Sequence, residues 1–151
     1  MIERAEQIVT LFGIGRVPVA PGTVASAAAV VVAVPIALVG GSATLLLLSL
    51  AAAGLGVWIS GEYARTTGRT DPRECVIDEL AGQWLACALA PLSVHGYLLA
   101  FVLFRLFDIA KPWPISSAEK LKDGIGIVAD DMAAGLVAGV IVMLVWQSGF
   151  L

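Results

Sequence analysis

Two pairs of adjacent acids, Asp78–Glu79 and Asp130–Asp131, stand at the edges of long apolar segments. An ionised carboxylate beside hydrocarbon costs free energy unless a positive group compensates it. Each pair alone is explained by a helix N-terminus, because acidic residues cap free N–H groups and complement the helix dipole. Together the pairs also suit a cation, since clustered carboxylates raise one another's pKa values unless a positive charge lies among them. Hard divalent ions such as Mg²⁺ take such oxygen ligands and commonly bridge to phosphate.

Basic residues lie along the chain between the two acid pairs. Arg105, Asp108 and Lys111 are three residues apart, which stacks them along one side of a helix that Pro112 ends. Arginine and lysine bind phosphate oxygens well. The sequence therefore predicts a metal site at the acids, with Arg105 and Lys111 holding a phosphate group beside it.

The glycine- and proline-rich segment 13–26 is a second candidate for anion binding. It is not a P-loop, because no Gly-Lys-Ser/Thr follows. Backbone N–H groups at a helix start, with the hydroxyls of Thr23 and Ser26, could hold a phosphate. In the alternative interpretation Thr23 only caps the helix and Ser26 is a small packing residue.

The sequence lacks the residues that several other classes of phosphatase use. Cys75 is not followed six positions later by an arginine, and no Asp-x-Asp-x-Thr motif occurs. The single histidine, His95, falls in a predicted turn away from the charged loops. Cysteine, aspartyl-motif and phosphohistidine phosphatases are therefore disfavoured.

The composition indicates an integral membrane protein. Of the 151 residues, 59% are hydrophobic and 14% charged, against about 25% charged in a soluble domain. No Asp, Glu, Lys or Arg occurs in 17–61, 80–104 or 132–151, and a membrane-spanning helix needs about 20 such residues. We expect one all-α domain over 1–151, a polytopic membrane helical bundle with four to five apolar helices. The net charge of −3 and the lack of a basic cluster give no sign of nucleic-acid binding, and the oligomeric state is left open.

The first apolar run predicts two spans, 23–39 and 43–60, joined by a turn at 40–42. The run 80–104 is either one span bent at Pro91 or a short hairpin that turns at 91–96. Only the hairpin puts all nine basic residues on one side of the membrane. The positive-inside tendency therefore favours the hairpin, with the charged loops 62–79 and 105–131 facing the cytoplasm.

The N-terminal segment 1–17 lacks the features of a signal peptide. Its apolar residues have roughly helical spacing and predict an amphipathic helix, which lies either on the membrane surface or against its own protein. These residues are Ile2, Ala5, Ile8, Val9 and Phe12.

Four stretches together resemble the phosphatidylglycerophosphatase A family of bacterial membrane enzymes. They are "PGTVAS" (21–26), "DPRECVIDELAGQW" (71–84), "FRLFDIAKPWPI" (104–115) and "GIGIVADDMAAG" (124–135). The resemblance implies Mg²⁺-dependent hydrolysis of phosphatidylglycerophosphate to phosphatidylglycerol and inorganic phosphate at the bacterial inner membrane, with the active site facing the cytoplasm. One departure is Ala25, where the family usually has glycine.

Candidate site residues follow from the resemblance by their positions, and their chemistry, not the family motif, assigns the individual roles. Asp108 becomes a nucleophile or general base, and Asp131 acts both in catalysis and as a metal ligand. The remaining metal ligands would be Asp78, Glu79 and Asp130; phosphate would contact Arg105, Lys111, Thr23 and Ser26.

Two other functions stay open at this point. One is a phosphatase for another lipid phosphate, such as phosphatidic acid. The other is a small transporter or ion-binding membrane protein, which would place carboxylates near the middle of its spans.

Overall fold

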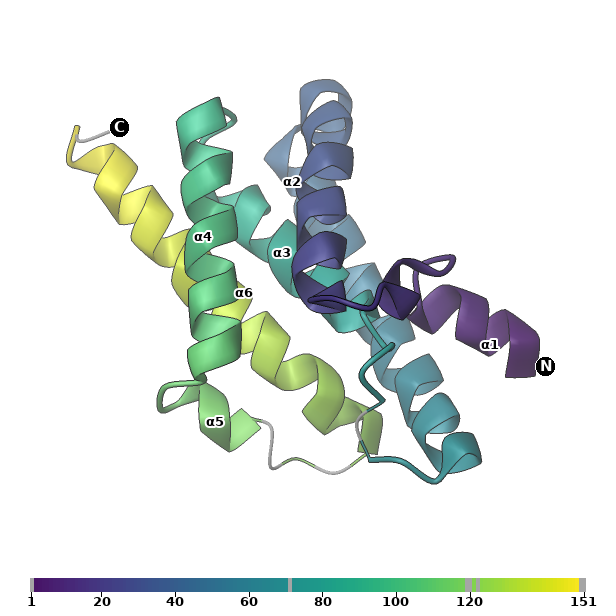
Figure 1. Ribbon diagram of the computed structural model, residues 1–151. Helices are drawn as coiled ribbons and strands as arrows, with labels where there is room; N and C mark the ends of the chain where they lie inside the picture. Colours follow the sequence, from purple (N-terminus) through teal and green to yellow (C-terminus); the bar gives the residue numbers. More distant parts are fainter. Residues whose placement is uncertain (1, 71, 119–120, 122, 150–151) are drawn as a thin grey trace.

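The computed structural model describes residues 2–70, 72–118, 121 and 123–149. Within these ranges the chain forms helices and no strand, which confirms the predicted all-α membrane protein. In chain order the elements are α1 (Ile2–Val9), the short 3-10 helix η1 (Ile14–Arg16), α2 (Pro21–Thr67), α3 (Ile77–Leu89), α4 (Val94–Ala110), α5 (Ile115–Ala118) and α6 (Asp123–Gln147) (Figure 1).

Helix α2 consists of two arms that fold back at Gly41, as the turn predicted at 40–42 requires (Figure 1). Gly41 has φ 75° and ψ 176°, a conformation that favours glycine. The first arm continues through Pro35 without ending, as expected for a proline in a membrane helix. The second arm runs on to Thr67, so the first charged loop is shorter than predicted.

Two helices, α2 and the segment Gly124–Gln147 of α6, are long and apolar enough to cross a membrane. Large apolar side chains also lie on the outside of the bundle. Val39 is 91% exposed and Val31 is 71% exposed. Such faces suit contact with hydrocarbon rather than water.

The segment 80–104 is a hairpin, and the alternative of one bent span is wrong. Helix α3 ends at Leu89 and α4 begins at Val94, where the Ser93 side chain accepts a hydrogen bond from the Gly96 N–H. Its second arm is longer than the predicted dozen residues because α4 continues to Ala110. Arg105 and Asp108 therefore lie within this helix and not in a loop.

Close contact between α3 and α6 depends on glycine. A Cβ atom on Gly135 would lie 2.2 Å from the Gly82 carbonyl oxygen, and one on Gly82 would lie 2.5 Å from the Asp131 carbonyl oxygen. Backbones this close are typical of small-residue interfaces between membrane helices. The crossing brings the start of α3 next to Asp131.

The N-terminal helix α1 packs against its own protein. Val9 is fully buried in a cluster with Ile59 and Tyr63 of α2, and Ala5 and Ile8 pack against the same cluster. Phe12, by contrast, is exposed, and the side chain of Ile2 lies outside the described residues. The interpretation that this amphipathic segment packs against its own protein is therefore confirmed for its buried face.

Candidate active site

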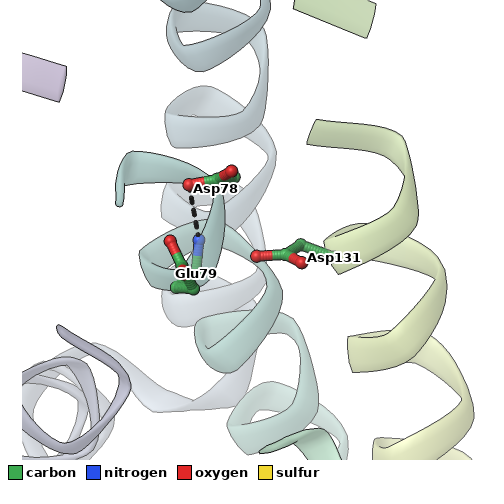
Figure 2. Close-up of side chains that lie close together, drawn as sticks. All are labelled: Asp78, Glu79 and Asp131. Atoms are coloured by element: carbon green, nitrogen blue, oxygen red, sulfur yellow. Dashed lines mark hydrogen bonds between the residues drawn. The ribbon is translucent and has the colours of Figure 1, made fainter. Parts of the chain in front are cut away.

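The crossing of α3 and α6 gathers three of the four predicted metal ligands. Asp78, Glu79 and Asp131 each offer a carboxylate oxygen, and these oxygens lie within 4.8 Å of one another. Figure 2 shows Asp131 reaching from α6 toward the two acids in the first turn of α3. Asp78 is 8% exposed and Asp131 only 3%. We call Asp78, Glu79 and Asp131 the acidic triad.

The fourth predicted ligand, Asp130, is engaged elsewhere. Its Oδ2 atom lies 2.6 Å from Lys111 Nζ, and its Oδ1 atom accepts a hydrogen bond from the Asp131 N–H. Lys111 is therefore paired with Asp130 at the edge of the site. Asp130 is not a member of the acidic triad.

Only the first acid pair lies where helix capping can act. Asp78 and Glu79 lie in the first turn of α3, and Asp78 Oδ1 accepts a hydrogen bond from the Glu79 N–H at 3.1 Å. Asp130 and Asp131 lie about two turns inside α6, which begins at Asp123. The capping interpretation is therefore wrong for the second pair.

Arg105 connects the acidic residues to the start of α2. Its Nη1 atom lies 2.6 Å from Asp108 Oδ2, 4.0 Å from Glu79 Oε1 and 3.4 Å from Ser26 Oγ. Asp108 in turn interacts with the side chain of Asp131. The basic–acid stripe on α4 thus lies directly against the triad, with Arg105 holding Asp108 in place.

The start of α2 also lies against the triad. A Cβ on Gly22 would lie 2.1 Å from Glu79 Oε1, so a larger residue at this position would displace the Glu79 carboxylate. Ala20 is the N-cap residue, and the interpretation of Thr23 as the cap is therefore wrong. The Ser26 hydroxyl donates to the Gly22 carbonyl at 2.8 Å while facing Arg105. Ala25, the departure from the family pattern, is fully buried.

The described residues around the acidic triad supply too little positive charge to compensate its three carboxylates. Glu79 Oε2 and Asp131 Oδ2 are buried with no hydrogen-bond partner among the described residues. Burial raises the pKa of Asp78 well above its usual range, and the negative charge of Glu79 raises it further. Burial also raises the pKa of Glu79, although Arg105 opposes this effect. Unpaired oxygen ligands converging on one point fit a hard divalent cation such as Mg²⁺.

A cavity of about 700 Å³ opens beside the triad at the end of the bundle where the charged connections meet. Asp108 and Lys111 line it together with the acids, whereas Arg105 is not among its lining residues. Sequence reasoning missed three polar residues of its wall, Arg65, Arg69 and Thr70. Arg65 pairs with Glu62 and Arg69 with Glu74, and their only sequence signal is their place in a charged loop.

Comparisons with known proteins identify the family of this chain. Residues 7–146 match the model of the family described as phosphatidylglycerophosphatase A. A protein of Haemophilus influenzae named phosphatidylglycerophosphatase A is 35% identical, over 89% of this chain and 83% of its own length. The Escherichia coli protein of the same name is 31% identical, over 93% of this chain and 84% of its own length.

A third relative carries a different name. This Bacteroides thetaiotaomicron protein, named as a candidate phosphatidylinositol-3-phosphatase, is 32% identical over 93% of this chain and 92% of its own length. No solved structure shows significant similarity to the chain. The family match and the identities over most of both chains lead to one conclusion: the chain belongs to the phosphatidylglycerophosphatase A family and is a phosphatase, an enzyme that hydrolyses phosphoric monoesters.

Proposed function

We propose that this enzyme hydrolyses the terminal phosphate of phosphatidylglycerophosphate, with Mg²⁺ held by Asp78, Glu79 and Asp131. The observation that carries this proposal is the acidic triad, which contains two unpaired buried oxygens and lines a cavity large enough for a phosphorylated headgroup. The names of the relatives from H. influenzae and E. coli support the choice of substrate.

A bound Mg²⁺ would supply positive charge to the phosphate oxygens and lower the pKa of a water molecule at the site. The triad itself keeps three carboxylates converging on one point. Their burial removes most of their surface from water, which strengthens the electrostatic interactions among them.

Asp108 is the residue of this chain best suited to act on the reacting atoms. It lines the cavity, and its ion pair with Arg105 at 2.6 Å fixes its carboxylate. It can take the proton of the attacking water as the ester P–O bond breaks. The same position suits direct attack on phosphorus, which would form an aspartyl-phosphate. Trapping with hydroxylamine distinguishes the two routes, because only an acyl phosphate reacts with it.

The other predicted site residues have different roles. Lys111 lines the cavity and can bind a phosphate oxygen while it neutralises Asp130. Arg105 and Ser26 act behind Asp108 and Glu79, which gives them a positioning role in this mechanism. Thr23, two positions after the first residue of α2, does not line the cavity, so its contact with phosphate stays a prediction.

We further propose a multi-pass location in the bacterial inner membrane with the cavity open to the cytoplasm. The turn at Gly41 and the turn between α3 and α4 lie at the opposite end of the bundle from the charged connections (Figure 1). The positive-inside tendency then assigns the charged end to the cytoplasm.

The test is phosphate release from phosphatidylglycerophosphate by the purified protein in detergent micelles, with Mg²⁺ and with a chelator. We expect activity only with the metal. The name of the B. thetaiotaomicron relative favours a second candidate, a phosphatase acting on phosphoinositides. Assays with phosphatidylinositol 3-phosphate and phosphatidic acid decide between them, and equal rates on all three lipids would contradict the specific assignment.

A further inference from the structure

A second hollow in the bundle is almost entirely apolar. It lies between the first arm of α2 and helix α4, with a volume of about 530 Å³. Its wall includes Val30, Val34 and Leu38 from α2, and Tyr97, Leu98 and Phe101 from α4. We call this hollow the α2–α4 groove.

The groove lies on the face of α4 that leads toward the active site. Leu98 and Phe101 line the groove, and Arg105 and Asp108 follow on the same face at steps of three or four residues. The face therefore changes from apolar to charged toward the acidic triad.

The same order occurs on α2. Gly22 contacts Glu79, Ser26 contacts Arg105, and Val30, Val34 and Leu38 follow at intervals of four residues. Two helices thus present matched faces that are polar beside the triad and apolar farther along. A diacyl lipid phosphate has the same order of polarity from headgroup to tail.

The groove begins a short way along α2 from the triad. Ala27, the first residue of its wall, lies five residues after Gly22, or about 8 Å at 1.5 Å per residue. The wall continues for about 16 Å to Leu38 and also includes Leu92 and Ser93 of the turn between α3 and α4. An acyl chain that follows a headgroup at the triad would therefore meet the groove farther into the membrane.

We propose that the α2–α4 groove binds one acyl chain of the lipid substrate while its phosphate lies in the cavity beside the acidic triad. This inference rests on the proposed function, because it takes the substrate to be a phosphorylated diacyl lipid. The groove anchors the lipid, and the distance from groove to triad sets how far the headgroup enters.

The first test fills the groove and compares two substrates with the same headgroup. Val30→Trp and Leu98→Trp place a large ring in the hollow. Val31→Trp and Val102→Trp place the same ring on the neighbouring exposed faces of the same helices, outside the wall of the groove. The substrates are phosphatidylglycerophosphate with two sixteen-carbon chains (roughly the length of natural lipid tails) and the same lipid with two very short chains.

We expect the groove variants to raise KM for the long-chain lipid at least about tenfold, which corresponds to losing the burial of roughly two methylene groups. Their kcat/KM for the short-chain lipid should stay within about twofold of wild type, which also shows that they are folded. The control variants should match wild type on both lipids. Equal effects of groove and control variants on the long-chain lipid would overturn the proposal.

A second readout does not depend on turnover. Wild-type protein in phosphatidylglycerol vesicles is mixed with long-chain phosphatidylglycerophosphate that carries a photoreactive diazirine in one chain, in the presence of a chelator. Cross-links concentrated at Val34, Leu98 and Phe101, rather than at Val31 and Val102, would support the groove even if the enzyme released no phosphate from this lipid. Cross-links spread evenly over both faces would mean ordinary bilayer contact and refute the groove, whatever the activity.

Discussion

The close crossing of α3 and α6 offers the sharpest mutational prediction. A Cβ on Gly135 would lie 2.2 Å from the Gly82 carbonyl oxygen, whereas carbon–oxygen contacts between packed helices are ordinarily about 3.3–3.6 Å. Gly135→Ala must therefore separate the two helices by about 1 Å at this point. Asp131 lies one helical turn before Gly135, so it moves away from Asp78 and Glu79.

A displacement of about 1 Å in a catalytic constellation costs roughly a hundredfold in rate. We expect Gly135→Ala to lower kcat for phosphate release by about this factor while circular dichroism still reports a helical protein. The matched control is Gly54→Ala, because a Cβ on Gly54 meets nothing within 4 Å. This control should keep its activity and gain up to about 1 kcal/mol of helix stability. A folded Gly135→Ala protein with wild-type kcat would refute the idea that this crossing sets the geometry of the triad.

Three further predictions concern the triad and the topology. Asp131→Asn or Glu79→Gln should abolish phosphate release. Each variant should still fold and, without metal, be at least as heat-stable as wild type, because each removes a buried charge. A destabilised variant would contradict this reasoning. Since burial raises the folded-state pKa of Asp78 and Glu79, the metal-free protein should lose stability as pH rises from about 4 toward neutrality. Mg²⁺ should therefore raise the melting temperature more at pH 7 than at pH 5, and a pH-independent shift would count against these acids as ligands. Impermeant thiol reagents added to intact cells should label a cysteine at position 41 but not one at position 69, and the opposite pattern would reverse the proposed orientation.

Much of the fold could be predicted from where charges are missing. The turn at 40–42 and the hairpin over 80–104 follow from the lengths of the uncharged runs and from the positions of the basic residues. The ends of the helices could not be predicted in this way. Helix α4 continues past the apolar run to Ala110, because its charged residues find partners within the bundle, as Arg105 does in Asp108 and Glu79.

The residue types of the site were easier to predict than the partner of each residue. Residue type alone indicated carboxylates with arginine and lysine beside them. Adjacent residues on a helix point about 100° apart, so Asp130 and Asp131 turn to different partners, Lys111 and the triad.

Close contacts at glycines explain how distant acids come together, which the charge pattern alone does not explain. Nothing in the sequence distinguishes Gly82 and Gly135, which permit close backbone approach, from Gly54, which has no neighbour within 4 Å of an added Cβ. Only the packed structure identifies the glycines that bring distant acids together. Arg65 and Thr70 escaped notice for a similar reason, since they line the cavity only because the second arm of α2 extends to Thr67.

Direct measurement of cation binding tests the central claim, that acids from α3 and α6 hold one ion together. Calorimetric titration of the purified, metal-free protein with Mg²⁺ should show saturable binding that Glu79→Gln and Asp131→Asn each weaken by at least about a hundredfold, the upper range for loss of an outer-shell partner. Undiminished Mg²⁺ binding by either folded variant would contradict the account.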